Sequence, residues 1–274
     1  MILIMPYIYI WKAKIMTKTI SLTNKYSIIT GASGFIGSSV ALKLATHGSN
    51  LILIDIDTDQ LNKLRKKIKN LNKKVKIDTI TSDISKVIER KNLIKYLKKN
   101  YNEIDIMVNS IGMVGTDTSS GWNVGYDKQS LESWDKCIGI NLTAVFFLIQ
   151  GIYKLMRKTK KASIVNISSI YGVIAPDWKM YEGTDIYNPA AYSVSKAGLI
   201  NMSRWLASTL SPYIRVNCVS PGGVLRNQKK KFIKKYSEKT LLKRMANESD
   251  ISDPVLFLVS DMSSYITGHN LIVD

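Results

Sequence analysis

Short apolar segments alternate with longer amphipathic ones along almost the whole chain, and no other feature constrains the fold as strongly. The apolar segments are continuous and rich in Ile and Val, which is typical of parallel strands buried on both faces. The candidate strands are Tyr26–Thr30, Leu51–Asp55, Val75–Ile80, Ile104–Asn109, Ser163–Ser168, Arg215–Val219 and Leu271–Val273.

The segments between the strands have the length and spacing of amphipathic helices. The candidate helices are Ile36–His47, Asp57–Leu71, Val87–Lys99, Leu131–Arg157, Ala190–Leu210 and Ser252–Asp261. This alternation predicts an α/β fold, with one doubly wound parallel sheet of about seven strands and helices on both faces. The 274 residues suffice for one large domain of this class and are few for two. We therefore predict a single domain over residues 16–274.

Residues 1–15 (MILIMPYIYIWKAKI) form an apolar segment in front of that domain. No basic stretch precedes the segment and no small-residue cleavage site follows it, so it does not resemble a signal peptide. It is also shorter than the roughly 20 residues that span a bilayer. We interpret it as an N-terminal arm or an upstream start, with an interfacial anchor as the alternative, and predict no membrane partner.

The formal net charge of +18 raises the question of a nucleic-acid partner. Most lysines are spread along the chain, as a general compositional bias would produce, and only Lys63–Lys76 and Lys229–Lys235 form clusters. We therefore predict no nucleic-acid partner.

Cysteine and histidine are both rare in this sequence. Cys137 and Cys218 lie in apolar segments and are too few for a disulfide framework, which predicts buried thiols in a reducing cytoplasm. His47 and His269 lie far apart along the chain, so no metal site is predicted.

A glycine-rich turn, TGASGFIG, follows the first strand and opens the first helix. Glycines there permit a tight turn and let the backbone approach a pyrophosphate, which the free N–H groups and the dipole of the helix N-terminus stabilise. The turn therefore predicts a dinucleotide site. The expected contacts in it are Gly31, Ser33, Gly34, Phe35, Ile36 and Gly37.

Asp55 ends the second strand, about 20 residues after the turn begins, where an acid can hydrogen-bond the adenosine ribose. Its carboxylate would repel a 2′-phosphate, and the glycine turn contains no Arg or Lys to offset this repulsion. We therefore predict NAD rather than NADP, with Ile56 beside the ribose. A helix-capping or surface acid is the alternative for Asp55.

Two further strand ends carry candidate cofactor contacts. Asp83 and Ile84 follow the third strand, at the expected adenine edge, and Asn109 and Gly112 follow the fourth, at the ribose side. Ordinary turn chemistry is the alternative for both pairs.

Tyr192 and Lys196 lie four residues apart, on one face of a predicted helix. A free tyrosine has a pKa of about 10, so acting as a base at neutral pH requires a shift of roughly three units. A nearby ammonium stabilises the phenolate and shifts the pKa in that direction. The helix follows a strand that ends in Ser168 and Ser169, and a hydroxyl there faces the crevice where open α/β sheets bind ligands.

These features and several others resemble the short-chain dehydrogenase/reductase family, whose members have a Rossmann-type fold. The motifs follow the family's order and spacing over residues 24–274: TGASGFIG, NSIG, GINLTAVF, IVNISS, YSVSK, RVNCVSPGG and SSYITGHNLIVD.

By this resemblance, Tyr192 is the general acid/base, and Lys196 lowers its pKa and contacts the nicotinamide ribose. Ser169, rather than Ser168, hydrogen-bonds the substrate oxygen, and Asn141 holds a water that relays protons to Lys196. The loop expected to hold the nicotinamide carboxamide contributes Pro221, Gly222 and Val224.

The sequence departs from the family pattern at three places. The spacing TGxxGxxG also occurs in longer sugar-nucleotide epimerases and dehydratases, whose extra C-terminal domain would not fit into 274 residues. The sequence stops at Asp274, where relatives continue with Gly-Gly and a short tail. Leu225 and Arg226 stand where relatives often have a Thr, so the cofactor contact of that Thr does not carry over.

Met113–Ser130 and Gly172–Pro189 are longer than the shorter family members need. The second is rich in aromatic, acidic and turn residues, which favours a sugar over a lipid or steroid. The basic run Lys229–Lys235 either binds a phosphate or forms a solvated helix face. The motifs SSIYGVIAPDW, NPAAYSVSK and KRMAN are also similar to bacterial oxidoreductases of flagellin modification and sialic-acid-like sugar synthesis.

We therefore expect an NAD-dependent oxidoreductase that transfers a hydride between the cofactor and a secondary alcohol or ketone of a sugar or sugar phosphate. The alternative is an NAD-dependent sugar epimerase or dehydratase, in which the hydride returns to the same substrate. A non-catalytic NAD-sensing or nucleic-acid-binding protein is the second alternative. The family often assembles through the two helices that contain Asn141 and Lys196, so a homo-oligomer, a tetramer or dimer, is expected.

Overall fold

The computed structural model describes residues 20–114, 117–184 and 186–274, which form one sheet covered by helices. All strands are parallel, in the order β3-β2-β1-β4-β5-β6-β7. The strands are β1 Tyr26–Thr30, β2 Asn50–Asp55, β3 Ile77–Thr81, β4 Ile106–Asn109, β5 Ala162–Ile167, β6 Ile214–Pro221 and β7 Asn270–Val273. The predicted α/β fold is confirmed. The predicted arm, 1–15, lies outside the described residues, and the division at residue 16 stays a prediction.

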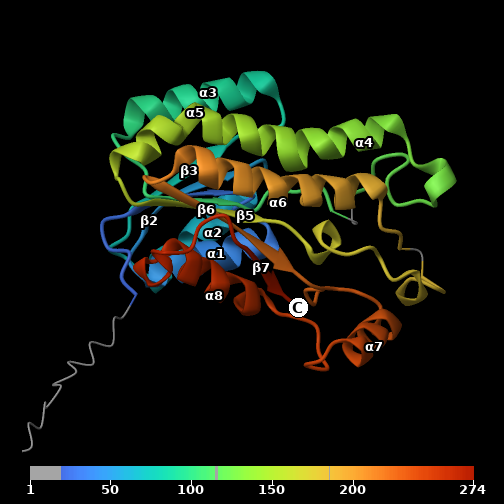
Figure 1. The fold of residues 1–274 in the computed structure, drawn as a ribbon. Helices are drawn as coiled ribbons and strands as arrows, with labels where there is room; N and C mark the ends of the chain where they lie inside the picture. The colour runs from blue at the N-terminus through green and yellow to red at the C-terminus, as the bar shows by residue number, and fades with distance from the viewer. Residues whose placement is uncertain (1–19, 115–116, 185) are drawn as a thin grey trace, which may run out of the picture.

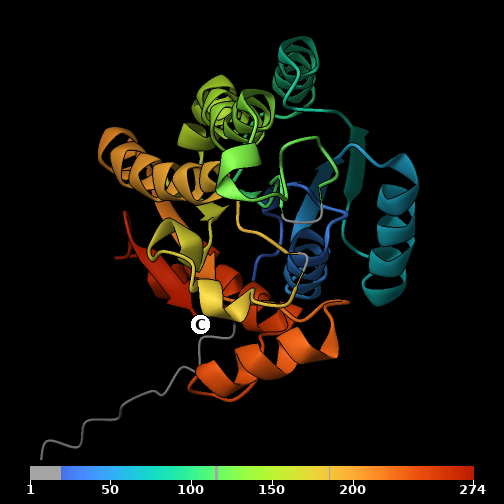
Figure 2. The same cartoon turned by 90° about the vertical axis from the view of Figure 1, so that its right-hand side faces the viewer.

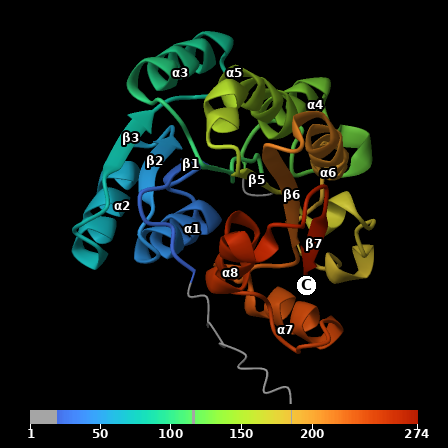
Figure 3. The same ribbon diagram turned by 60° about the vertical axis from the view of Figure 1, so that its left-hand side comes forward.

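Helices cover both faces of the sheet (Figures 1 and 3). One layer consists of α1 Phe35–Thr46, α2 Thr58–Leu71 and α8 Glu248–Val259. The opposite layer consists of α3 Val87–Asn100, α4 Leu131–Ile138, α5 Ala144–Lys158 and α6 Ala190–Leu210. Helix α7, Lys230–Lys239, lies apart from both layers, near the end of β7.

Burial along the sheet follows the strand order. Every residue of β4 and β5 is buried, whereas the edge strands β3 and β7 contain no fully buried residue. Strands in the middle of the sheet are covered on both faces by helices, so they are buried along their whole length, and the edge strands are not.

Two helices differ from their predicted extents by more than one residue at an end. The predicted helix Leu131–Arg157 is divided by a π-helical turn, Gly139–Thr143, between α4 and α5. The last helix begins at Glu248 rather than Ser252 because Asn247 caps it and Asp250 completes a capping box. Apolar periodicity detects neither a change in hydrogen-bond register nor a polar first turn.

The segment Leu131–Lys158 is long and apolar enough to cross a membrane by length and composition alone. In the fold it contains α4 and α5, which pack against α6 and α3 respectively. It is therefore a helix of the protein core.

Candidate active site

The glycine turn joins β1 to α1 at the carboxyl edge of the sheet. Gly31 has φ +64°, and a Cβ there would lie 2.7 Å from the carbonyl oxygen of Ser110. A Cβ on Gly37 would collide with the Gly31 carbonyl. The backbone of α1 is therefore in direct contact with the backbone of the turn, which only glycine at position 37 permits. Gly34 caps α1 without a side-chain hydrogen bond, and the first turn of α1 contains no acidic residue. This cradle fits a pyrophosphate at a helix N-terminus.

Asp55 lies directly beside this turn. Its Oδ2 accepts a hydrogen bond from Ser33 N (2.9 Å), and its Oδ1 accepts one from Ile56 N (2.7 Å). The Ile56 side chain is exposed. The structure thus brings the predicted ribose-binding acid and the predicted phosphate-binding turn into direct contact.

The predicted adenine contacts take part in local turn structure. Asp83 Oδ1 accepts hydrogen bonds from the backbone N–H (3.1 Å) and the hydroxyl (2.6 Å) of Ser85. Ile84 is buried, and its carbonyl accepts a hydrogen bond from Arg90. These hydrogen bonds are ordinary turn interactions, which the sequence analysis gave as the alternative to an adenine contact. The adenine contact of Asp83 and Ile84 stays a prediction.

Asn109 differs from its expected role. Its side chain is buried and bridges Thr30 Oγ1 (3.3 Å) and Asn166 Oδ1 (2.7 Å), and Asn166 in turn donates to Ser203. The carboxamide therefore joins β1, β4 and β5 inside the sheet, and the cofactor contact of Asn109 stays a prediction. Sequence position alone could not separate these roles, because both place Asn at a strand end.

Lys196 lies on α6 and is buried, with its Nζ donating to the carbonyl of Ile167 (2.9 Å). Its Nζ is 5.8 Å from the Tyr192 ring centre. A Cβ on Gly112 would lie 3.3 Å from this ammonium, so the predicted loop glycine lies directly beside the lysine. Burial lowers the pKa of Lys196 to about 8.

The pKa of Tyr192 differs from the expectation. Burial raises it, because the apolar surroundings penalise the phenolate, while a hydrogen bond with Ser169 acts in the opposite direction. The Lys196 ammonium, 5.8 Å from the ring centre, also carries the charge that favours the ionised phenol. The cost of burial opposes both contacts, and it is not visible in the sequence.

The two serines after β5 have different partners. Ser168 Oγ donates to the carbonyl of Lys196 (2.8 Å) and so fastens α6 to the sheet. Ser169 Oγ accepts a hydrogen bond from Tyr171 N (3.2 Å), and Ser169 lines a cavity together with Tyr192. This arrangement agrees with Ser169 as the substrate-facing hydroxyl.

Asn141 lies on the π-helical turn and is fully buried. Its Oδ1 accepts from Met113 N (2.7 Å) and its Nδ2 donates to Ser195 Oγ (3.0 Å). Both ends of the side chain are therefore engaged with protein groups, and they fasten the loop after β4 to α6. The water contact predicted for Asn141 stays a prediction.

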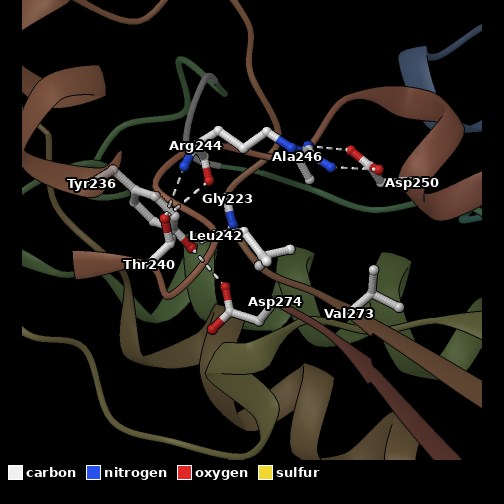
Figure 4. A pocket seen from close by; sticks show the side chains of 10 residues that line it. Gly223, Tyr236, Thr240, Leu242, Arg244, Ala246, Asp250, Val273 and Asp274 are labelled. Carbon is white, nitrogen blue, oxygen red and sulfur yellow. Dashed lines mark hydrogen bonds and ion pairs between the residues drawn. The ribbon is translucent and has the colours of Figure 1, made fainter. Parts of the chain in front are cut away.

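The segment Pro221–Val224, which begins at the last residue of β6, is held by hydrogen bonds from two sides. Gly222 N donates to the carbonyl of Val273 (2.8 Å), and Gly223 N donates to the hydroxyl of Tyr236 (2.5 Å). Figure 4 shows a small pocket here, in which Tyr236 lies between Gly223 and Asp274. The sequence did not single out Tyr236 because its role depends on α7 folding back over the loop.

Arg226 links this loop to the glycine turn. Its guanidinium carbon lies 4.2 Å from the ring centre of Phe35, and its Nη1 pairs with Glu248 (2.5 Å). The residue that stands in place of the family's frequent Thr therefore lies over the start of α1.

A cavity of about 210 Å³ opens in front of Ser169 and Tyr192. Its wall comes from the 170–192 segment, the loop after β6 and α7, which lie side by side in Figure 2. The described lining residues are Val114, Ser169, Ile170, Tyr171, Tyr181, Ile186, Tyr187, Asn188, Pro189, Tyr192, Gly222, Gly223, Gln228, Phe232, Tyr236 and Met245.

The basic run forms α7, whose Phe232 and Tyr236 face the cavity. None of its lysines is among the described residues that line the cavity. Lys235 instead donates to the carbonyls of Lys179 and Glu182, and Lys239 pairs with Asp177. The run is thus an amphipathic helix that covers the site with its apolar face. In the described ranges, no group of three or more His, Cys, Asp or Glu side chains could hold a metal ion.

The chain matches known proteins over nearly its full length. A family model described as enoyl-(acyl carrier protein) reductase matches residues 31–274. The post-translational flagellin modification protein A of Campylobacter coli is 34% identical over 254 residues, which are 92% of this chain and 98% of that protein. The 3-oxoacyl-(acyl-carrier-protein) reductase of Thermotoga maritima is 32% identical over 92% of this chain and 97% of that protein.

A solved structure agrees with these matches. The short-chain dehydrogenase of Leptospira borgpetersenii with bound NAD⁺ has a TM-score of 0.78 and 31% identity, covering 93% of this chain and 92% of that one. The predicted family and enzyme class are thereby confirmed. The chain belongs to the short-chain dehydrogenase/reductase family of nicotinamide-dependent oxidoreductases.

Proposed function

We propose that the protein interconverts a secondary alcohol and a ketone on a small carbohydrate-like molecule, with NAD as hydride carrier and Ser169, Tyr192 and Lys196 as its catalytic residues. The observation that supports this most directly is that Ser169 and Tyr192 line one cavity, with the Lys196 ammonium 5.8 Å from the centre of the tyrosine ring.

The proposed chemistry follows from these positions. In alcohol oxidation, Tyr192 Oη takes the hydroxyl proton while Ser169 Oγ holds the substrate oxygen. The bound nicotinamide supplies the hydride acceptor. The Lys196 ammonium, 5.8 Å from the ring centre, favours the phenolate form of Tyr192 that accepts this proton. Asn141 acts as a positioning residue, because its side chain fastens the loop after β4 to α6.

The choice of NAD over NADP rests on Asp55. Its carboxylate lies against the amide of Ser33, where it repels a 2′-phosphate. Replacing Asp55 with Ser should therefore raise the NADP⁺/NAD⁺ ratio of kcat/KM by about tenfold or more, which corresponds to the removal of about 1.4 kcal/mol of discrimination. An unchanged ratio contradicts this assignment.

A carbohydrate-like substrate is supported by the cavity wall. The wall combines tyrosine rings with hydroxyl and amide groups, and its volume is below the roughly 300–1,000 Å³ of pockets for drug-sized ligands. The relatives named above act in flagellin modification and on an acyl carrier protein substrate, so their names do not select one substrate.

The decisive test is NAD⁺ and NADP⁺ reduction with a panel of sugars, polyols and sugar phosphates, with Tyr192→Phe as the control. NADH formation that the variant loses supports the proposal. Substrate conversion without net NADH favours the epimerase alternative, since there the hydride returns to the substrate. NADH binding without conversion of any panel member, together with tight and salt-sensitive nucleic-acid binding, favours the non-catalytic alternative.

We also propose that the protein forms a homo-oligomer and that it is cytoplasmic. The outer face of α5 and α6 exposes Phe147 and Trp205, which contact Phe146 at ring-centre distances of 5.3 and 6.4 Å. Such aromatic exposure suits a subunit interface, so we assign the homo-oligomer to this face. The two free buried cysteines suit the cytoplasm.

A further inference from the structure

The guanidinium of Arg226 reaches from the loop after β6 to the glycine turn. Its central carbon lies 4.2 Å from the ring centre of Phe35, which is the first residue of α1. The turn itself, TGASGFIG, contains no Lys or Arg, whereas a diphosphate carries a negative charge on each phosphate. Arg226 therefore brings a positive charge to a phosphate cradle that has none of its own.

The cradle keeps hydrogen-bond donors free for an anion. The N–H groups of Ser33 and Gly34 are already hydrogen-bonded within the fold. The next two, those of Phe35 and Ile36, have no acceptor among the described residues. Free N–H groups at a helix N-terminus attract an anion. The guanidinium and the free N–H groups thus meet at the same first turn of α1.

The guanidinium is held at one nitrogen and open at the other two. Its Nη1 donates to the Leu225 carbonyl (2.8 Å) and to Glu248 Oε1 (2.5 Å). No described residue accepts a hydrogen bond from its Nε or Nη2, and both nitrogens are accessible on a side chain that is 20% exposed. The planar donor fork of arginine matches the oxygens of a phosphate. The Nε–Nη2 edge is therefore available to a ligand.

The backbone of Arg226 is also fixed. Arg226 N donates to Gln228 Oε1 (2.5 Å), and Gln228 Nε2 donates to the Val224 carbonyl (2.9 Å). The side chain is thus held by the Phe35 ring, by Glu248 and through its own backbone, before any ligand binds. A donor that is held in place in advance loses less conformational entropy when it binds.

We infer that Arg226 is a cofactor-binding residue, whose Nε–Nη2 edge binds the diphosphate of the nicotinamide dinucleotide. The free N–H groups of α1 bind the same diphosphate from the glycine turn. NAD and NADP share this diphosphate, so the inference goes beyond the proposed function and depends neither on the choice between the two cofactors nor on the substrate.

The test compares ADP-ribose, which contains the diphosphate but no nicotinamide, with adenosine, which contains neither. ADP-ribose is titrated into the full chain by calorimetry at about 0.15 M salt, and adenosine is measured by its competition with ADP-ribose. Arg226→Met keeps a long side chain and removes the charge. It should weaken ADP-ribose binding by about tenfold to a hundredfold, as expected for lost charge-assisted hydrogen bonds, and change adenosine binding by less than about twofold.

Arg244→Met is the matched control, because it removes the same charge from the same segment. Arg244 pairs with Asp250 through two hydrogen bonds (2.6 and 2.9 Å). Charges are screened over about 8 Å at this salt concentration, so ADP-ribose affinity should stay within about twofold of the wild type. An equal loss in Arg244→Met means that a distant charge suffices, and it overturns the inference.

Glu248→Gln is a second variant, which keeps the inference testable if Arg226→Met does not fold. Its amide oxygen still accepts from Arg226 Nη1, while the negative charge beside the proposed diphosphate is removed. It should bind ADP-ribose at least as tightly as the wild type, and weaker binding contradicts the inference. In Arg226→Met, unchanged ADP-ribose affinity or an equal loss of both ligands also overturns it, because an equal loss indicates a purely structural residue.

Discussion

Tyr192 and Lys196 have pKa values displaced in opposite directions by the same cause. Burial disfavours the charged form of each side chain, so the phenol becomes a weaker acid and the ammonium a stronger one. At neutral pH the site therefore holds a protonated tyrosine and a mostly protonated lysine. This state is ready to donate a proton to a ketone and must lose one before it oxidises an alcohol.

The pH profiles of the two directions should differ accordingly. The pKa of Tyr192 is raised above its usual value of about 10, so kcat/KM for oxidation should climb by about tenfold per pH unit up to about pH 8, where Lys196 begins to lose its charge. Reduction should stay level and then fall above pH 8, as Lys196, with a pKa of about 8, loses its charge. Initial rates in both directions between pH 6 and 10 test this, and an oxidation plateau near pH 7 contradicts it.

Ser168 and Ser169 provide a matched pair of substitutions. Ser169→Ala should lower kcat/KM by about a hundredfold or more, since it removes the hydroxyl proposed to hold the substrate oxygen in the cavity that Tyr192 also lines. Ser168→Ala should lose about 1 kcal/mol of stability, because the bond to the Lys196 carbonyl disappears, while activity changes little. Steady-state kinetics and urea unfolding of both variants decide the assignment, which fails if the losses are reversed.

The partners of buried polar side chains could not be predicted from the sequence. Gly172–Pro189 was recognised as an aromatic-rich segment beside the site, but whether the Asn188 carboxamide in it is partnered depends on atoms from distant segments. Asn109 shows the same limit, because its carboxamide bonds to Asn166 across the sheet, and its cofactor contact stays a prediction.

At the scale of elements, β1 and α6 have the predicted bounds to the residue, Tyr26–Thr30 and Ala190–Leu210. A strong local signal marks one end of each element, because the glycine turn follows β1 and the Asn188-Pro189 pair precedes α6. The π-helical turn at Gly139–Thr143 has no such signal, because it keeps the apolar face continuous. The sequence thus predicted the layers of the fold and missed the change of register that carries Asn141.

Helix α7 should affect substrate affinity through its apolar face. Phe232 is buried between Tyr181 and Tyr236, with ring centres 6.0 Å from each. Phe232→Ala should therefore raise KM by about fivefold to tenfold, which corresponds to the loss of one or two kcal/mol of packing, and change kcat less.

The control on the same helix is Lys234→Ala, because the Lys234 side chain is 80% exposed. It should leave KM within about twofold, as is usual for a surface substitution. A larger effect of Lys234 than of Phe232 would restore the phosphate-binding interpretation of the basic run.

At the scale of the whole molecule, a charge of +18 opposes the assembly of identical chains. In the proposed oligomer, apolar contact at the α5–α6 face has to outweigh that repulsion. Salt screens charges over about 10 Å at 0.1 M, so raising the salt concentration should favour assembly rather than weaken it.

The oligomer can therefore be tested by mutation and by salt together. Trp205 is 56% exposed on the α5–α6 face, and Trp205→Glu should place a desolvated carboxylate in the interface and dissociate it. Light scattering should show an oligomer that grows more stable between 0.05 and about 0.3 M salt, and a monomer for the variant. Leu241→Glu, at a residue 95% exposed beyond α7, should leave the assembly intact. If the wild-type chain is a monomer at every salt concentration, the exposed rings of α5 and α6 do not form a subunit interface.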